Sequence, residues 1–191
     1  MTCWSIGLAV VLGAAVFVAQ GAFAPERVPP DVPEPVVERL GTVPNYENPQ
    51  QRHSKMLDEL DYNAAMAVND EGGHGWADNH ARIEDAEKIA MAHCAVQGPG
   101  CRIILRILPE TQVDIDGQPL SRTAAEALRR YVDEPRSKAI ALTGHGGWGA
   151  AWNRSSRRNA VTGALESCRK HETTTAPGVE ITTECRLIWT D

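Results

Sequence analysis

At 191 residues, 42% of them hydrophobic, the chain is long enough to bury one ordinary core or two small ones. Its formal net charge of -6 argues against a nucleic-acid partner, because such proteins neutralise phosphates with a basic surface.

Residues 4–24 contain no charged side chain, and Gln20 is their one strongly polar residue. A run of about 20 apolar residues can cross a bilayer as a helix or serve as the core of a signal peptide. Ala22-Phe23-Ala24 has the small-x-small form of a cleavage site, although Pro25 disfavours cleavage directly before it. We therefore assign residues 1–24 to a signal peptide or to a transmembrane anchor, and both alternatives stay open.

A proline-rich segment follows, residues 25–53, and most of its prolines lie among valine and glutamate. This composition does not support a helix or a central strand, and it is typical of an extended strap. The strap is interpreted either as a disordered tether or as an arm that lies along a partner's surface.

The rest of the chain contains an internal repeat. Residues 64–94 and 138–168 align without a gap, and each window precedes a second cysteine that opens an apolar run. The ten identities between the windows are Ala65/Ala139, Ala67/Ala141, Gly72/Gly146, Gly73/Gly147, Gly75/Gly149, Ala77/Ala151, Asn79/Asn153, Ala86/Ala160, Ala90/Ala164 and Cys94/Cys168. We place repeat 1 at residues 54–110 and repeat 2 at residues 135–191.

In repeat 1, the pattern predicts a short helix over 54–60 with Ser54 as its cap. It then predicts strands and a helix in the order β-β-α-β, with boundaries at 63–69, 75–79, 80–94 and 101–108. Repeat 2 follows the same plan, with strands at 138–143, 148–153 and 186–189 and a helix capped by Ser155 or Ser156. A connecting segment, residues 111–134, holds an Asp116-Gly117 turn and a helix that Ser121 caps.

These elements predict an α+β fold: two tandem β-β-α-β repeats with antiparallel sheet and helices on one face, behind an N-terminal hydrophobic helix. Whether the repeats share one sheet or pack face to face stays open at this level.

Four of the five cysteines fall as one pair in each repeat. Three pairings are possible, and the repeat symmetry favours Cys94 with Cys101 and Cys168 with Cys185. A zinc site is disfavoured because paired Cys-x-x-Cys spacings are absent from the sequence. Disulfides that persist imply an oxidising compartment, so we expect residues 25–191 to lie outside the cytoplasm, in the periplasm.

Catalytic chemistry has little support in the sequence. The loop Gly144–Gly147 resembles the oxyanion loop of some esterases, but no Gly-x-Ser-x-Gly nucleophile accompanies it. His74 and His145 are not equivalent in the repeat, and Asp78, His80 and His93 could share a metal only through tertiary folding. We expect no enzyme activity, no metal and no cofactor.

Two further features are candidate contact residues. Trp148 and Trp152 lie four apart, and with Trp189 they could pack between sheet and helix or form an aromatic platform. Arg154, Arg157 and Arg158 open the second helix, where the helix dipole disfavours them, so an acidic partner would explain them.

Asn79 and Asn153 stand before the helix of each repeat, and they are interpreted as satisfying backbone groups at that corner or as contacting a ligand. Charge also differs between the repeats: residues 56–110 carry ten acidic and four basic side chains, and residues 135–191 carry five acidic and eight basic ones. Simple surface drift, different partners for the two copies, or mutual attraction would each produce this difference.

The pattern Ala-x-Ala, Trp-Gly, Asn, Ala-x-x-x-Ala-Leu-x-x-Cys and Cys-Arg resembles a small secreted bacterial family, domain of unknown function four-one-eight-nine. Repeat 2 carries this pattern at Ala139, Ala141, Trp148, Gly149, Asn153, Ala160, Ala164, Leu165, Cys168 and Cys185. The resemblance implies an exported, disulfide-bonded domain with no established activity.

Together these features predict a non-enzymatic, periplasm-facing interaction protein. It would be an accessory subunit or partner of a larger bacterial membrane or envelope complex, with the inner membrane contacted through residues 4–24 if they are retained. A free periplasmic binding module, or an inhibitor of an enzyme or polymer, is the alternative.

Overall fold

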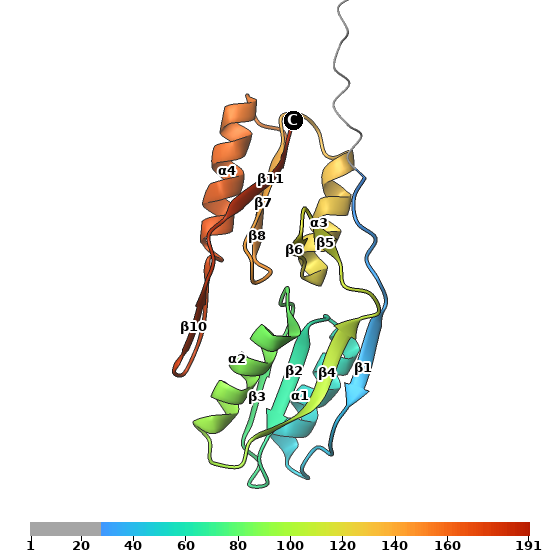
Figure 1. Ribbon diagram of the computed structural model, residues 1–191, viewed down its shortest axis with the longest axis vertical. Coiled ribbons are helices and arrows are strands. Elements are labelled where there is room, and N and C mark those ends of the chain that lie inside the picture. The colour runs from blue at the N-terminus through green and yellow to red at the C-terminus, as the bar shows by residue number, and fades with distance from the viewer. Residues whose placement is uncertain (1–27) are drawn as a thin grey trace, which may run out of the picture.

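The computed structural model describes residues 28–191 (Figure 1). The predicted signal peptide or anchor lies outside these residues. Within them, the chain is an α+β protein with four helices and antiparallel strand pairings throughout. Its two repeats form separate sheets and lie end to end along the long axis of the molecule, so they do not share one sheet.

Repeat 1 contains a sheet of four strands in the order β1-β4-β2-β3. The strands are β1 (Pro35–Arg39), β2 (Ala64–Val68), β3 (His74–Ala77) and β4 (Arg102–Pro109). Two helices cover this sheet, α1 (Glu47–Glu59) and α2 (Ile83–Ala95). The predicted strand, strand, helix and strand are all present, and β1 is added at the edge beside β4.

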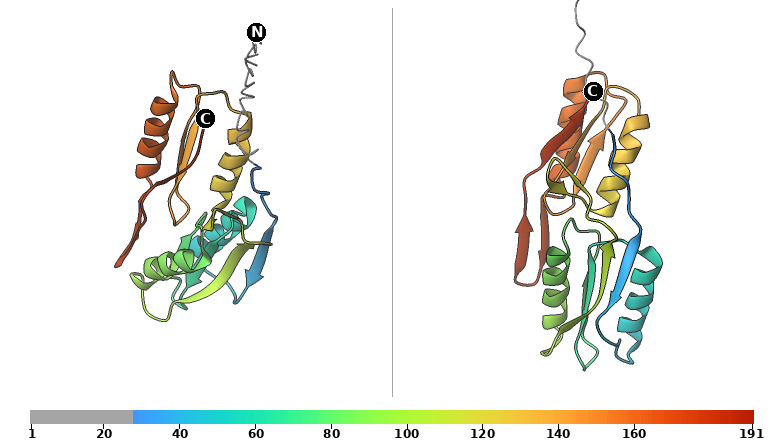
Figure 2. Two further views of the ribbon diagram at one scale, coloured as in Figure 1. Left: turned by 45° about the horizontal axis from the view of Figure 1, so that its top comes forward. Right: turned by 45° about the vertical axis from the view of Figure 1, so that its right-hand side comes forward.

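The helices of repeat 1 lie on opposite faces of its sheet, as the right-hand view of Figure 2 shows. In β2, Met66 and Val68 pack into one core cluster with Met56 of α1. The intervening Ala65 and Ala67 pack into another cluster with α2. The prediction of helices on one face is therefore wrong, because both faces of β2 are apolar and each needs a cover.

Repeat 2 has the same three layers around a smaller sheet in the order β11-β7-β8. Its strands are β7 (Ala139–Leu142), β8 (Trp148–Ala151) and β11 (Arg186–Thr190). Helix α4 (Arg157–Arg169) covers the alanine face through Ala160 and Ala164. Helix α3 (Arg122–Asp133) covers the other face through Leu128 and Tyr131.

Helix α3 thus occupies in repeat 2 the layer that α1 occupies in repeat 1. The spacing agrees, since α3 ends at Asp133 and α1 ends at Glu59, 74 positions earlier, the same offset that separates α4 from α2. The structural unit is α-β-β-α-β, one helix longer than the sequence identities reveal.

Two predicted boundaries differ in the structure. Helix α1 begins at Glu47, so the prediction that residues 25–53 support no helix is wrong, and Ser54 lies within the helix rather than at its cap. Pro49 is tolerated because the first turn of a helix needs no backbone N–H there. Strand β1 also lies in the strap, as an edge strand that begins with Pro35, a position where proline costs no ladder hydrogen bond.

The connecting elements follow the prediction more closely. Ser121 caps α3 by accepting a hydrogen bond from the N–H of Ala124 at 3.3 Å. Asp116 and Gly117 both have positive φ and join the short strands β5 (Asp114–Ile115) and β6 (Gln118–Pro119). Ser156, one of the two predicted caps, caps α4 through the N–H of Asn159 at 3.2 Å.

The long cysteine loop of repeat 2 forms a hairpin that the sequence did not predict. Its strands are β9 (Thr173–Ala176) and β10 (Val179–Thr182). Ala176, Val179 and Ile181 pack against the core cluster that includes α2 of repeat 1. The loop by which the repeats differ therefore holds one repeat against the other.

Both predicted disulfides are present, one in each repeat. Cys94 pairs with Cys101 and Cys168 pairs with Cys185, with Cα atoms 6.1 and 6.0 Å apart. The first bond ties the end of α2 to the start of β4, and the second ties the end of α4 to the start of β11. Such bonds indicate an oxidising, extracytoplasmic environment. In residues 28–191, no helix is long and apolar enough to span a membrane.

A close approach between helix and hairpin explains why the same glycine stands in both repeats. A Cβ atom on Gly149 would lie 2.6 Å from the carbonyl oxygen of Ala164 and would also overlap the N–H of Cys168. In repeat 1, a Cβ on Gly75 would meet the equivalent atoms of Ala90 and Cys94. The helix therefore rests directly on the backbone of β3 or β8.

We expect Gly149→Ala to lower the free energy of unfolding by about 1 to 3 kcal/mol, because backbone atoms must move apart. Urea unfolding of the full chain measures this change. Gly144→Ala is the control, since its Cβ would first meet the Thr183 methyl group at 3.3 Å, a side chain that can shift. Equal losses in the two variants would contradict the close-approach explanation.

Candidate functional site

The two repeats meet where the β7–β8 turn of repeat 2 contacts the chain just before α2. The N–H of Ala81 donates to the carbonyl of His145 at 3.0 Å, and the Ser121 hydroxyl donates to the carbonyl of Gly146 at 2.8 Å. A Cβ on Gly146 would lie 2.7 Å from the nitrogen of Ala81. The glycine of this predicted turn is therefore needed for contact between the repeats as well as for its positive φ.

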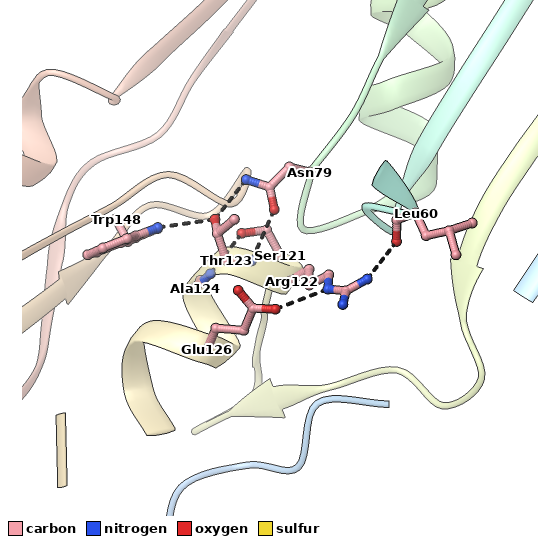
Figure 3. Close-up of polar contacts among 8 residues, drawn as sticks. All are labelled: Leu60, Asn79, Ser121, Arg122, Thr123, Ala124, Glu126 and Trp148. Carbon is pink, nitrogen blue, oxygen red and sulfur yellow. Dashed lines mark hydrogen bonds and ion pairs between the residues drawn. The ribbon is translucent and has the colours of Figure 1, made fainter. Parts of the chain in front are cut away.

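Asn79 connects repeat 1 to the first turn of α3, as Figure 3 shows. Its Oδ1 accepts the backbone N–H of Thr123 at 3.1 Å, and its Nδ2 donates to Thr123 Oγ1 at 2.7 Å. The indole N–H of Trp148 donates to the same hydroxyl at 3.1 Å. One threonine thus joins repeat 1, helix α3 and the sheet of repeat 2.

Arg122 adds a second link at this junction (Figure 3). Its Nη1 donates to the carbonyl of Leu60, the left-handed residue that ends α1, at 2.9 Å. Its Nε pairs with Glu126 one turn along α3 at 3.1 Å. The end of α1 and the start of α3 are therefore held together.

The repeat-equivalent asparagines share a backbone role. Asn79 and Asn153 both adopt left-handed φ, 56° and 53°, a conformation that asparagine tolerates better than most residues. The Asn79 side chain bonds to the first turn of α3 rather than to backbone groups at the corner before α2, where the prediction placed its partners. Asn153 is exposed, and its backbone N–H donates to the carbonyl of Pro135 at 3.4 Å.

Two histidines are buried at the junction between the repeats, His80 with 7% and His145 with 6% of its surface exposed. The Nδ1 of His145 lies 2.8 Å from the Thr183 hydroxyl. The Nδ1 of His80 has no hydrogen-bond partner among the described residues. Burial lowers the pKa of both imidazoles, because the charged form loses its hydration there.

An open pocket of about 220 Å³ lies at this junction, and both repeats contribute to it. Asp78, Asn79 and His80 line it from repeat 1, and His145, Lys170 and His171 line it from repeat 2. The Asp78 carboxylate already pairs with Arg52 at 2.7 Å. In residues 28–191, no group of three or more histidine, cysteine, aspartate or glutamate side chains is arranged to hold a metal ion.

The predicted tryptophan contacts lie mainly inside repeat 2. Trp148 is half-buried beside the cluster that includes α3, and Trp189 is buried with its ring centroid 5.5 Å from that of Tyr131. Trp152 is half-buried just beyond β8, and the guanidinium of Arg130 lies 5.1 Å from its ring centroid. The tryptophans therefore pack toward α3, whereas α4 takes the alanine face.

The predicted arginine contacts are exposed at one end of the molecule. Arg154, Arg157 and Arg158 are all exposed, in or just before the first turn of α4. We call the surface that they form with Arg130, Arg136 and Trp152 the basic end.

A further set of surface residues was not found from the sequence. Seven large hydrophobic residues are exposed in the described part of the chain, and four belong to the segment 28–46: Val28, Val36, Leu40 and Tyr46. Valines in the strap were visible in the sequence, but nothing there showed which of them β1 would turn outward.

Comparison of the chain with protein-family models, with curated protein sequences and with solved structures finds no match. The family resemblance of repeat 2 therefore stays a prediction.

Replacing Thr123 by valine tests the junction. Thr123→Val leaves Asn79 Nδ2 and Trp148 Nε1 without their shared acceptor, which costs about 1 to 3 kcal/mol in unfolding free energy. Thr162→Val, at an exposed position in α4, is the matched control and should change stability by less than about 0.5 kcal/mol. Chemical denaturation measures both, and a Thr123→Val variant as stable as its control would contradict the role of this hydroxyl.

The buried histidines predict a pH dependence. In the unfolded chain both protonate at about pH 6.5, whereas in the folded chain they stay neutral to lower pH. The neutral, buried state of these two histidines therefore costs no stability above about pH 6.5, and the free energy of unfolding falls as the pH drops below that value. Urea midpoints at about pH 7.5 and pH 5.5 should differ more in the natural chain than in His80→Gln/His145→Gln. An unchanged pH dependence in the double variant would assign the effect to other groups.

Proposed function

We propose that this protein is a non-enzymatic interaction protein that faces the periplasm and serves as an accessory subunit of a larger bacterial membrane or envelope complex. The strap is the surface that contacts its protein partner. The observation that supports this proposal is the exposure of Val28, Val36, Leu40 and Tyr46 along one short segment of the chain.

The strap is held in place before any partner binds. All five residues of β1 pair with β4. The pairing continues at both ends, where the N–H of Glu110 donates to the carbonyl of Glu34 at 2.9 Å and the N–H of Leu40 donates to the carbonyl of Ile104 at 2.8 Å. Val37 packs against the core while Val36, 44% exposed, points away from it. A partner that contacts Val36 and Leu40 therefore meets a preorganised segment, and binding costs little ordering of residues 34–40.

Strand β1 also offers its outer edge. It is the terminal strand of the sheet order, so its backbone groups on that side are available for pairing with an extended segment. Pro35 and Glu38 limit indiscriminate pairing with other edges. Such an edge suits one defined partner better than self-association.

A free periplasmic binding module or inhibitor is the second candidate function. The polar pocket between the repeats, with His171 and Lys170 at its margin, favours it. The two candidates differ in whether the protein is recovered with a membrane complex or alone in the soluble periplasm.

Purification of the native protein from its own membranes in mild detergent, with intact-mass spectrometry of the eluate, tests this proposal. We expect the protein to elute with stoichiometric subunits of one complex. Recovery of the protein alone, in the soluble periplasmic fraction, would contradict the accessory-subunit function and favour the second candidate.

Variants of the strap sharpen the same test. Val36→Asp should weaken recovery of the complex about tenfold, because burying a valine on association is worth about 1.5 kcal/mol. Val96→Asp is the matched control, since Val96 is 65% exposed at the end of α2, away from the strap. If both variants retain the complex equally, the strap is not the docking surface.

A further inference from the structure

We propose that the basic end contacts an anionic phospholipid surface. This inference concerns a different surface from the strap and goes beyond the proposed function. It rests on the charge of the basic end, on the apolar groups beside it and on where the described chain begins.

Three chain segments bring the basic end together. The N–H groups of Asn153 and Arg154 donate to the carbonyls of Pro135 and Ser137 at 3.4 and 3.1 Å. The α3–β7 loop, with the exposed Arg136, therefore lies beside the start of α4. Arg130 reaches the same place from the last turn of α3, where it stacks on Trp152.

The positive charge at this end is largely uncompensated. Arg130 pairs with Glu134 at 3.6 Å, and Lys138 pairs with Asp191 at 3.8 Å while its ammonium group caps the end of α3. Among residues 28–191, no ion pair is found for Arg136, Arg154, Arg157 or Arg158.

Acidic side chains are few nearby: Asp133 is exposed at the end of α3, and Glu166 lines the same shallow hollow as Arg154. The positive N-terminal end of the α4 dipole adds to the field of the arginines. Arg157 donates through Nε to the Thr190 hydroxyl at 3.3 Å, and none of the four arginines has an ion pair among the described residues. Exposed guanidinium groups of this kind are suited to phosphate, which they can bind in a bidentate manner.

Apolar groups accompany these arginines. Val132, in the last turn of α3, is 44% exposed, and Trp152 is half-buried with its ring near the surface. Tryptophan and arginine together are characteristic of the membrane interface, where one end of a side chain is apolar and the other is hydrated. An acidic protein surface would account for the arginines but not for the exposed valine.

The start of the described chain lies at the same end. In both Figure 1 and Figure 2, the strap begins beside the C-terminal end of α3, at the end of the molecule where α4 also starts. The apolar run ends at residue 24, and four residues reach at most about 14 Å, so a bilayer that holds residues 4–24 would face the basic end.

The test uses the full chain, reconstituted into vesicles whose lipids carry brominated acyl chains that quench tryptophan. Trp4→Phe removes the tryptophan of the apolar run, and subtraction of a Trp4→Phe/Trp152→Phe variant isolates the signal of Trp152. We expect Trp152 to be quenched in phosphatidylglycerol vesicles and much less in phosphatidylcholine vesicles. Each arginine shifts the contact equilibrium about fivefold, so Arg154→Gln/Arg157→Gln/Arg158→Gln should shift it about a hundredfold toward release.

Lys55→Gln/Lys88→Gln/Arg102→Gln is the matched control, because it removes three exposed basic groups from repeat 1. It should keep the quenching of Trp152. Equal quenching in neutral and anionic vesicles, or none in either, would overturn the proposal. If Trp152 is not quenched and the arginine variant loses the native complex, the basic end contacts a protein rather than lipid. The Val36→Asp variant tests the proposed function separately.

Discussion

The fold depends on the close approach of α2 to the β2–β3 hairpin in repeat 1 and of α4 to the β7–β8 hairpin in repeat 2. Gly75 and Gly149 remove the side chain at the point of contact, and the alanines of α2 and α4 present a smooth surface to it. A disulfide then ties the end of that helix to the next strand. The residues that the two copies share are therefore mostly those that no larger side chain could replace, which is why the repeat stays visible in the sequence.

The second constraint is the junction around α3, which makes one body of two small units. A three-stranded sheet with one helix buries little apolar surface, so each repeat gains from a second helical layer. In repeat 2 that layer is α3, and its first turn bonds to Asn79 of repeat 1 through Thr123. Val32 of the strap packs against the core clusters of both repeats, and the β9–β10 hairpin reaches α2. Strand β1 in repeat 1 and the basic end in repeat 2 therefore belong to one body.

The sequence predicted what local patterns determine: the repeated strands and helices, Ser121 and one of two alternative caps of α4, and both disulfides. The sequence did not predict the elements whose formation depends on contacts with distant parts of the chain. Residues 35–39, in the proline-rich strap, form a strand because β4 offers an edge to pair with. The threonine-rich loop became a hairpin that packs on α2. Period-two patterns did not show that alanines would face one helix and larger residues another. Arg154, Arg157 and Arg158 were singled out in the sequence and are exposed in the structure, and their role as partner contacts stays a prediction. The outward-facing valines of the strap and the role of Thr123 need three-dimensional placement.

The two proposals place the protein contact at β1 in repeat 1 and the lipid contact at the basic end in repeat 2. Both contacts can form at once only if the repeats keep a fixed arrangement. Native-state hydrogen exchange with mass spectrometry tests this coupling most directly. If the junction joins the repeats into one cooperative unit, the slowest amides of β2 in repeat 1 and β7 in repeat 2 will exchange with the same free energy of opening, and denaturant will lower both in parallel. Independent opening of one sheet while the other stays protected would contradict the account.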